Sequence, residues 1–328
     1  MAETGHLTVG LIGCGGIMDW HIRNLKKVPN VTIGAMADPA LDNIKKTKER
    51  HPDLAAASEY ASHKELLAGS KLDAVIICSR HSDHAPQVMD GLAAGCHVLV
   101  EKPFVGSIAQ ARAAIKAAHK AKKVLMVSYQ RHFDPKFRYM RKLVQEGRIG
   151  TIQTISSSLG QFWMQGTRGS WRQDPQYSLG GQLNDSGSHV VDIALWITDL
   201  KPVEVYANLD FHGCKVDINS AVSVKLEGGA VWTICVGGNT PGFWEYLVIA
   251  GDKGALFYEN GNLTIAEARG RFKAEWFDGY HDQTAGFVKA VRGEAGNEVP
   301  GEFGLRVTAL TQSAFRSAKL KRPVRISL

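Results

Sequence analysis

The sequence lacks long apolar runs and paired cysteines. No apolar run approaches the roughly 20 residues needed to cross a bilayer, so we predict no membrane association. The stretch Leu7–Met18 resembles a signal-peptide core, but the acidic Glu3 precedes it and glycines interrupt it, so we interpret it as a strand and its turn. The five cysteines are an odd number without a Cys-x-x-Cys pair. This usage is typical of free thiols in a reducing compartment, and we expect a soluble, cytoplasmic protein.

Charge of one sign is not concentrated anywhere in the chain. Lys and Arg number 39 against 32 Asp and Glu, a formal net charge of +7. The densest basic runs, Lys45–Arg50 and Lys319–Arg325, contain no aromatic residue. Single-stranded nucleic acids need aromatic stacking platforms, so we predict no nucleic-acid partner and interpret these runs as solvated helix faces. The mild positive field suits anionic or phosphate-bearing small molecules.

Length and composition favour two globular domains. The chain is longer than an average domain of about 150 residues, and its 44% hydrophobic and 22% charged residues are ordinary for folded proteins. The first 129 residues alternate short apolar runs with amphipathic segments, as parallel strands and helices do in a doubly wound sheet. The predicted strands are Leu7–Cys14, Val31–Ala37, Ala74–Cys78, His97–Val100 and Val124–Ser128, and the predicted helices include Ile17–Lys27, Ala85–Ala94 and Ile108–Lys120. We predict an α/β Rossmann domain over residues 1–129.

The pattern changes after residue 129. A helix over Pro135–Glu146 precedes apolar runs separated by glycine and asparagine turns, which are typical of hairpins. The predicted strands are Thr151–Leu159, Val203–Phe211, Ala221–Leu226, Ala230–Gly237, Tyr246–Ala250 and Leu263–Ala268. Helices over Asp282–Arg292 and Gly304–Lys319 and an extended Pro323–Ser327 complete the chain. We predict an α+β domain with a large, mostly antiparallel open sheet over residues 130–328.

A glycine-rich turn follows the first predicted strand. Gly13-Cys14-Gly15-Gly16-Ile17-Met18 has the spacing Gly-x-Gly-x-x, with Met18 where a dinucleotide-binding turn has its third glycine or alanine. Gly13 permits the tight turn, and Gly15 lets the backbone approach a pyrophosphate. Asp38 ends the next predicted strand, where a carboxylate accepts hydrogen bonds from ribose hydroxyls and repels a 2′-phosphate. We therefore predict NAD rather than NADP, the alternative being that Asp38 is an ordinary turn residue.

The segment Glu101-Lys102-Pro103 ends a predicted strand within AGCHVLVEKPF. Together with the glycine turn, and with Asp185-Ser186-Gly187-Ser188-His189 downstream, it makes the chain similar to the glucose–fructose oxidoreductase/inositol dehydrogenase (Gfo/Idh/MocA) family. The similarity extends to the closing segment VPGEFGLRVTALTQSAFRSAK. It implies a Rossmann domain, a C-terminal open-sheet domain, NAD(P)-linked oxidation of a sugar or cyclitol, and a homo-oligomer, dimer or tetramer, formed through that sheet.

The resemblance and the glycine turn together define the predicted cofactor contacts. They are Gly13, Gly15, Gly16, Ile17, Met18, Asp38, Ser79, His81, His84, Glu101, Lys102 and Gln130. Two departures from the family pattern affect this set. Ser79-Arg80-His81 stands where the family usually reads Thr-Pro-Asn, and Met18 occupies the third fingerprint position. For His81 and His84 the spacing alone favours a solvated helix start.

Alcohol oxidation needs a proton acceptor at the hydroxyl, because NAD takes the hydride. Lys102 lies just beyond a parallel strand, where ligands bind in open α/β sheets, and its ammonium is suited to polarise the reacting oxygen. Taken alone, such a lysine is more often a surface charge. Asp185 and His189 are four residues apart and would share a face of a helix running to Thr198, as an oriented acid–base pair. The alternative is an Asp185 cap and a His189 in the core.

Further side chains extend the predicted site. Asp192 extends the pattern to Asp-x3-His-x2-Asp, but no second His/Cys cluster accompanies it, so we predict no metal. Gln161–Arg172 is rich in Trp, Arg and Gln, which suits a polyol pocket; tryptophans at a domain interface are the alternative. The predicted substrate contacts are Lys102, Arg131, Trp163, Arg168, Trp171, Arg172, Asp185 and His189.

These expectations point to an NAD-dependent oxidoreductase. As the resemblance implies, it would oxidise a secondary hydroxyl of a sugar, sugar derivative or cyclitol, with Lys102, Asp185 and His189 as catalytic residues. A non-catalytic NAD-sensing regulator and an NAD-assisted glycosidase of the same fold are the alternatives. The presence of all three catalytic residues argues against the regulator.

Overall fold

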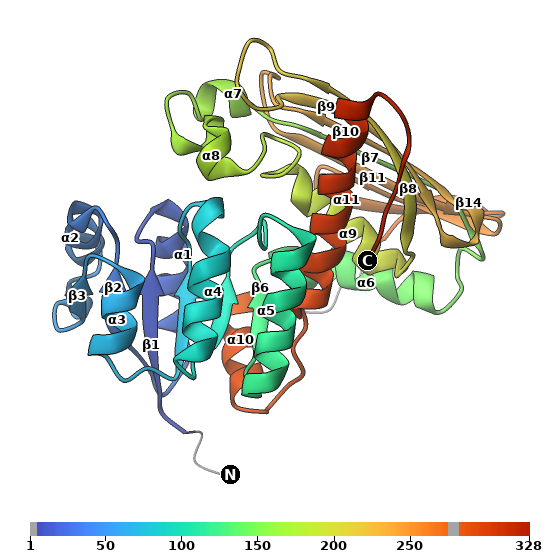
Figure 1. Cartoon of the computed structure of the whole chain (residues 1–328). Coiled ribbons are helices and arrows are strands. Elements are labelled where there is room, and N and C mark those ends of the chain that lie inside the picture. Colours follow the sequence, from blue (N-terminus) through green and yellow to red (C-terminus); the bar gives the residue numbers. More distant parts are fainter. Residues whose placement is uncertain (1–4, 275–281) are drawn as a thin grey trace. The chain divides into compact units, whose positions relative to one another are not determined.

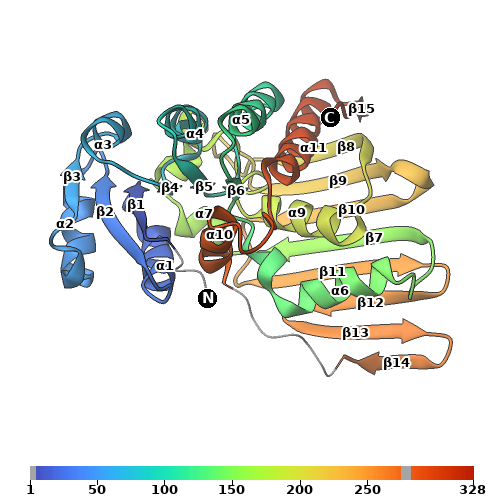
Figure 2. The same cartoon turned by 90° about the horizontal axis from the view of Figure 1, so that it is seen from below.

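The computed structural model describes residues 5–274 and 282–328, which group into two compact units (Figures 1 and 2). The first unit contains residues up to 130 together with the described part of 281–304, and the second contains the remainder. Helix α10 (Gln283–Val291), which the sequence assigned to the second domain, packs against helix α1 of the first unit. In the same unit, Pro300 bridges to Met126. No helix in the described ranges is long and apolar enough to span a membrane.

A six-stranded parallel sheet forms the centre of the first unit. Its order is β3-β2-β1-β4-β5-β6, the doubly wound arrangement that the alternating pattern predicts. The strands are β1 (Leu7–Ile12), β2 (Val31–Ala37), β3 (Ser58–Tyr60), β4 (Ala74–Ile77), β5 (His97–Val100) and β6 (Leu125–Val127). Strand β3 has no apolar run because it is a short, largely exposed edge strand, so its sequence carries no strand signal.

Helices cover both faces of this sheet (Figure 2). They are α1 (Gly16–Leu25), α2 (Leu41–Arg50), α3 (His63–Gly69), α4 (His84–Ala93), α5 (Ile108–Ala121) and α10. Figure 2 shows α3, α4 and α5 along one face, with α1 and α10 on the other. Ser62 and Ser107 cap α3 and α5 by accepting hydrogen bonds from backbone N–H groups. Helix α1 begins after Gly15 without a side-chain cap.

The second unit is built on a nine-stranded sheet of order β14-β13-β12-β11-β7-β10-β9-β8-β15. All neighbours are antiparallel except β7 and β10, which confirms the mostly antiparallel sheet. The strands are β7 (Ile152–Gly160), β8 (Pro202–Asp210), β9 (Asn219–Leu226), β10 (Val231–Gly237), β11 (Trp244–Gly251), β12 (Gly254–Glu259), β13 (Asn262–Glu267), β14 (Gly270–Lys273) and β15 (Val324–Arg325). The sequence missed β12 and β14, which extend the two hairpins around β13.

Strict alternation separates the two faces of this sheet. In β9 and β10, Val222, Val224, Trp232 and Ile234 are buried, and their neighbours in sequence are exposed. The helices of this unit are α6 (Pro135–Gln145), α7 (Trp163–Gly166), α8 (Pro175–Ser178), α9 (Gly187–Thr198) and α11 (Gly301–Leu320), whose first residues belong to the first unit. Helix α9 packs on α6 and β7, and all of its residues except His189 are buried.

Candidate active site

The glycine turn has the backbone that a dinucleotide requires. Gly13 has a φ of +85°, and an added Cβ would meet the backbone carbon of Cys78 at 2.7 Å, so only glycine fits there. Gly15 and Gly16 face open space, since an added Cβ would meet nothing within 4 Å at either residue. The uncapped N-terminus of α1 therefore offers backbone N–H groups at an open surface, which fits a pyrophosphate.

The next two residues of the turn point to different environments. The side chain of Ile17 is 46% exposed, whereas Met18 is 0% exposed. Met18 therefore fills the core beneath α1, and only its neighbours face the open side of the turn. The larger side chain at the third fingerprint position is accommodated by complete burial.

Asp38 is held between the glycine turn and α2. Its Oδ2 accepts a hydrogen bond from the N–H of Cys14 (2.8 Å). Its Oδ1 accepts from the N–H of Ala40 (2.9 Å) and from Nδ2 of Asn43 (3.1 Å). The bond to Ala40 is the turn contact proposed as the alternative, and the bond to Cys14 ties the same carboxylate to the cofactor turn. The carboxylate is thus fixed at the end of β2, where ribose recognition requires it.

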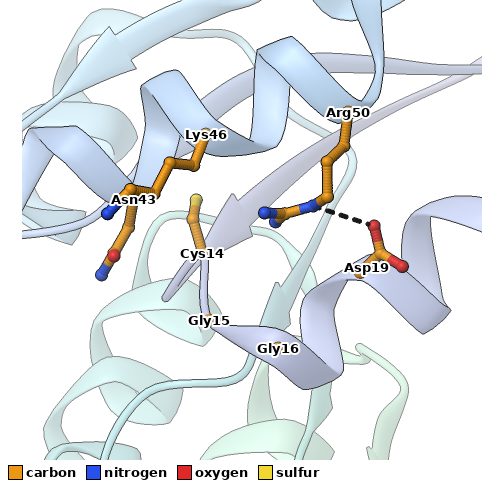
Figure 3. Close-up of a pocket in the computed structure, with 7 residues that line it drawn as sticks. All are labelled: Cys14, Gly15, Gly16, Asp19, Asn43, Lys46 and Arg50. Atoms are coloured by element: carbon orange, nitrogen blue, oxygen red, sulfur yellow. Dashed lines mark hydrogen bonds and ion pairs between the residues drawn. The ribbon is translucent and has the colours of Figure 1, made fainter.

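A pocket of about 300 Å³ opens beside this turn (Figure 3). Its lining residues are Cys14, Gly15, Gly16, Asp19, Asn43, Lys46 and Arg50. Burial raises the pKa of the Cys14 thiol to about 12, and the nearby Asp38 adds to this rise, so the thiol lines the pocket as a neutral group. Arg50 donates through Nε to Oδ1 of Asp19 at 3.3 Å.

The basic run 45–50 is a solvated helix face, as predicted, and it also borders the pocket: the side chains of Lys46 and Arg50 are 60% and 47% exposed. Asn43, Lys46 and Arg50 lie three and four residues apart on α2, so one helix face presents all three to the pocket. The spacing could have indicated this shared face. The sequence does not show that this solvated face also borders the glycine turn.

The two histidines in the segment after β4 are buried, contrary to the solvated helix start suggested by spacing. His81 and His84 are 4% and 0% exposed. Nδ1 of His84 lies 2.9 Å from the carbonyl oxygen of Pro103, and Nε2 lies 3.3 Å from that of Ser79. Burial lowers the pKa of His84, although these carbonyl contacts oppose the shift. His84 therefore bridges the loops that follow β4 and β5.

The loop after β5 carries Glu101, which points inward, and Lys102, which is half-buried. Glu101 accepts hydrogen bonds from His21 Nε2 (3.0 Å) and from the hydroxyl of Ser128. Burial raises the pKa of Glu101, but the hydrogen bond and charge of His21 and the charge of Lys102 outweigh it, so the pKa lies below its ordinary value. The predicted cofactor contact Glu101 thus has its carboxylate engaged inside the protein.

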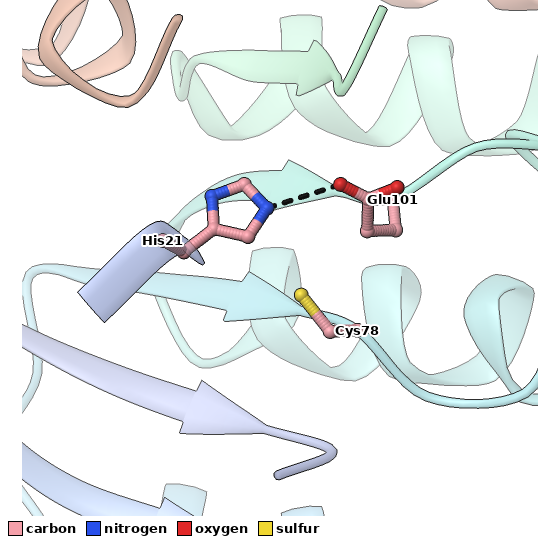
Figure 4. A group of neighbouring side chains, drawn as sticks. All are labelled: His21, Cys78 and Glu101. Atoms are coloured by element: carbon pink, nitrogen blue, oxygen red, sulfur yellow. Dashed lines mark hydrogen bonds and ion pairs between the residues drawn. The ribbon is translucent and has the colours of Figure 1, made fainter. Parts of the chain in front are cut away.

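His21, Cys78 and Glu101 form a buried group (Figure 4). One ligand atom from each lies within 4.8 Å of the others, a spacing that could hold a metal ion. However, His21 also uses Nδ1, at 3.1 Å from Oγ1 of Thr284. Burial, reinforced by the charge of Glu101, raises the pKa of the Cys78 thiol well above its ordinary value. Engaged ring nitrogens and a protonated thiol favour a hydrogen-bonded network over a metal site.

In the second unit, Asp185 lies in a turn two residues before α9. It therefore does not share a helical face with His189, and Ser186 occupies the N-cap position. Asp185 is 5% exposed, and its Oδ2 accepts hydrogen bonds from Nε1 of Trp163 (2.9 Å) and Nε of Arg172 (3.2 Å). His189 is half-buried in the first turn of α9, with its N–H bonded to the carbonyl of Ser186.

Asp217 anchors the turn that leads to Asp185. Its carboxylate accepts hydrogen bonds from the N–H groups of Gly181 (2.6 Å) and Leu183 (2.8 Å). An added Cβ at Gly181 would meet the carbonyl oxygen of Asp217 at 1.9 Å, so the close approach requires glycine. Burial raises the pKa of Asp217 against the effect of these hydrogen bonds. Sequence analysis missed Asp217, because an acid in a hairpin loop gives no sign of its partners.

Two family models match these units. The model described as "Oxidoreductase family, NAD-binding Rossmann fold" matches residues 7–129, and that described as "GFO/IDH/MocA C-terminal domain" matches residues 137–257. The chain belongs to the Gfo/Idh/MocA oxidoreductase family. Its first unit is an NAD-binding Rossmann domain, which confirms the predicted cofactor.

Members of the Gfo/Idh/MocA family resemble the chain over nearly its whole length. The uncharacterized oxidoreductase YrbE of Bacillus subtilis is 26% identical, covering 98% of this chain and 97% of its own. The myo-inositol 2-dehydrogenase of Thermotoga maritima is also 26% identical, covering 98% of each chain. The WlbA dehydrogenase of Bordetella pertussis, solved with NADH and UDP-GlcNAcA, has a TM-score of 0.86 at 22% identity, covering 98% of this chain and 99% of its own.

The predicted substrate contacts within residues 163–172 of this Gfo/Idh/MocA chain separate into one buried tryptophan and three accessible side chains. Trp163 is 4% exposed in a cluster with Val216 and Ile218, so it offers Asp185 its indole N–H and no open ring face. Trp171 and Arg172 are half-buried, with the Arg172 guanidinium 4.4 Å from the Trp171 ring centre, and Arg168 is exposed. These three remain accessible.

Two ion pairs that the sequence did not predict engage the segment after Gln130, and one of them involves Arg131, a predicted substrate contact. Arg131 pairs with Glu245, whose pKa is raised by burial and partly restored by Arg131. His132 Nε2 lies 2.8 Å from Oδ2 of Asp192, and both side chains are buried. The third member of the Asp-x3-His-x2-Asp pattern thus pairs with His132. Exposed Gln130 precedes both pairs and belongs to the first unit.

Proposed function

We propose that this protein is an NAD-dependent dehydrogenase that oxidises a secondary hydroxyl of a sugar, sugar derivative or cyclitol. The observation that carries the proposal is that His189 is only half-buried. Every other residue of α9 is buried, so this imidazole alone on that helix can meet a ligand. An imidazole is the side chain best suited to exchange a proton near neutral pH.

Each catalytic residue has a separate role in the proposal. The glycine turn and Asp38 would hold NAD, which would supply the hydride acceptor for the substrate carbon. Lys102 polarises the substrate oxygen and stabilises its developing negative charge. His189 accepts the hydroxyl proton, so the products are a ketone, NADH and a proton. Asp185 acts through the turn before α9, where Trp163 and Arg172 hold its carboxylate.

The names of the relatives support the substrate class. One relative is a myo-inositol 2-dehydrogenase, and a structural neighbour was solved with a nucleotide sugar derivative. Cyclitols and sugars share secondary hydroxyls on a six-membered ring. We propose that Arg168, Trp171 and Arg172 contact such a ring, because aromatic faces pack on C–H surfaces and guanidinium groups bond hydroxyls.

Turnover of free NAD with a panel of sugars and cyclitols tests the proposal. A dehydrogenase produces NADH in proportion to the substrate consumed. Binding of NAD without turnover of any compound would favour the NAD-sensing regulator. Release of an aglycone from glycosides without net NADH would favour the NAD-assisted glycosidase.

We further propose a cytoplasmic homo-oligomer assembled through the open face of the nine-stranded sheet. Small and polar side chains stand in register on this face, among them Ser156, Ser223 and Thr233. The free thiols Cys14, Cys78 and Cys96, all buried, suit a reducing compartment. Sedimentation of the purified chain measures the oligomeric state, and a monomer at micromolar concentration would contradict the assembly.

A further inference from the structure

We infer that His21 is a positioning residue for Lys102 and acts through Glu101. The inference rests on the proposed function, in which Lys102 touches the substrate oxygen. His21 lies on α1, Glu101 follows β5, and the network that joins them ends on α10. Side chains separated by up to 263 positions in the chain thus meet in one buried group of the first unit.

The first step of the argument is the bond between His21 and Glu101. Their Nε2 and Oε1 atoms lie 3.0 Å apart, the His21 side chain is 0% exposed and that of Glu101 is 11% exposed. The pKa of Glu101 is lowered, so its carboxylate is ionised at neutral pH and can only accept hydrogen bonds. Nε2 of His21 therefore carries a proton and donates a hydrogen bond to Glu101.

The second step is how α10 completes this arrangement. Thr284 lies 3.1 Å from Nδ1 of His21 and orients the ring from the opposite side. The Ser128 hydroxyl donates to Oε1 of Glu101, and Nε2 of Gln283 donates to the same hydroxyl. Ser128, Gln283 and Thr284 are all buried. Thr284 thus holds His21 and Gln283 holds Ser128. His21 and Ser128 are the two donors to Oε1 of Glu101.

The third step leads from Glu101 to Lys102. The other carboxylate oxygen, Oε2, lies 3.3 Å from the backbone N–H of Lys102. Nδ1 of His84 lies 2.9 Å from the carbonyl oxygen of Pro103, the residue that follows Lys102. The backbone on both sides of the Lys102 side chain is therefore held by buried groups. Such a support fixes where the ammonium stands, because a catalytic group is only as well placed as its supporting shell.

His21→Leu removes the donor and keeps most of the volume. We expect kcat to fall by about 10²-fold, the cost of misplacing a reacting group by about 1 Å. The NAD dissociation constant and the substrate KM should change much less than kcat, because Glu101 and Lys102 are the only predicted contacts affected, while the glycine turn, Asp38 and the second unit are untouched. His21→Gln, whose amide nitrogen can replace Nε2, should recover most of the lost kcat. A histidine with a merely structural role would not produce a loss that falls mainly on kcat and that a new hydrogen-bond donor restores.

A matched control is His63→Leu. His63 also bonds a carboxylate within the first unit, at 2.9 Å from Asp90, but it lies on α3 away from the glycine turn and the Lys102 loop. Its kcat should remain close to that of the wild type. Equal losses of kcat in both leucine variants, or no loss in His21→Leu, would overturn the positioning role.

Hydrogen exchange provides a readout that needs no turnover. In His21→Leu, peptides covering residues 98–104 and 283–291 should exchange faster, and the glycine-turn peptide should not. If the wild type oxidises no compound of the panel but these peptides still respond, the proposed function fails and the support of the Lys102 loop stands. Unchanged exchange in both peptides would overturn the inference whatever the activity.

Discussion

The indole N–H of Trp163 donates a hydrogen bond to Oδ2 of Asp185 at 2.9 Å. This bond joins a buried tryptophan, packed with Val216 and Ile218, to the acidic residue of the DxxxH motif. Arg172 shares the same oxygen at 3.2 Å. The carboxylate of Asp185 is therefore oriented by residues of the second unit. Its partners are Trp163 and Arg172, whereas a shared helical face would have paired it with His189.

Trp163→Phe tests this orientation. The substitution preserves an aromatic ring but removes the donor, which should cost about 1–3 kcal/mol in the free energy of unfolding and also reduce kcat. Trp232→Phe is the matched control, because buried Trp232 donates to Ser157 at 2.7 Å in the sheet of the same unit. Both variants should lose stability in urea denaturation, but only Trp163→Phe should lose turnover. Equal turnover in the two would show that Trp163 serves stability alone.

Lys102→Met should retain NAD binding and lose most turnover, because Lys102 acts on the substrate oxygen in the proposed reaction. The measurements are kcat for oxidation and NADH affinity by fluorescence. A folded Lys102→Met protein with nearly full activity would show that another group polarises the oxygen.

His189→Ala should lower turnover by roughly 10²–10⁴-fold, the usual contribution of general acid–base catalysis. In the wild type, kcat/KM for oxidation should rise with pH as the imidazole loses its proton, because only the neutral ring accepts one. The variant should lack this acidic limb while binding NAD normally. Persistence of the same limb in His189→Ala would assign the base to a different residue.

Asp38→Ser tests cofactor choice. Loss of charge-assisted bonds worth about 1.5–3 kcal/mol should weaken NAD binding by about 10–100-fold. NADP binding should strengthen, because the repelling carboxylate is gone while Arg50 and Lys46 already line the adjacent pocket. Adding Arg50→Ala should reverse the gain. Fluorescence titration with NADH and NADPH measures the affinity for each cofactor. An NADPH affinity that is the same with and without Arg50→Ala would contradict this role of the pocket.

Glu101→Gln tests the buried carboxylate through the pH dependence of stability. The pKa of Glu101 lies below its ordinary value of 4.5 because the hydrogen bond and charge of His21 and the charge of Lys102 outweigh the effect of burial. A lowered pKa stabilises the folded protein fully above the ordinary value, and the stabilisation is lost as pH falls through the folded value. The difference in unfolding free energy between wild type and variant should therefore shrink below about pH 4.5. A difference independent of pH would mean that Glu101 is not ionised in the folded protein.

The sequence carried enough information for the fold and for the position of the cofactor turn. Runs of valine, isoleucine and leucine predict the central parallel strands because both faces of that sheet are covered. The residue pattern of Gly13, Gly15 and Asp38 predicts NAD because those residues act through local backbone geometry. Strand β14 was missed because Gly270–Lys273 contains a single apolar residue, whereas β12 was missed although its residues Ala255–Tyr258 are apolar or aromatic.

Other residues acquired their roles only from the tertiary structure. His21 meets Glu101, Asp217 binds the turn at Gly181, and Trp163 bonds Asp185, each across many positions of the chain. The spacing of residues within one segment indicates which of them share a helix or strand. The sequence by itself therefore determined most of the helices and strands and the position of the glycine turn. Burial pairs side chains from different segments, because a polar group removed from water must find a partner wherever the fold supplies one. That pairing assigned Glu101 to the interior and placed His84 against the carbonyl of Pro103.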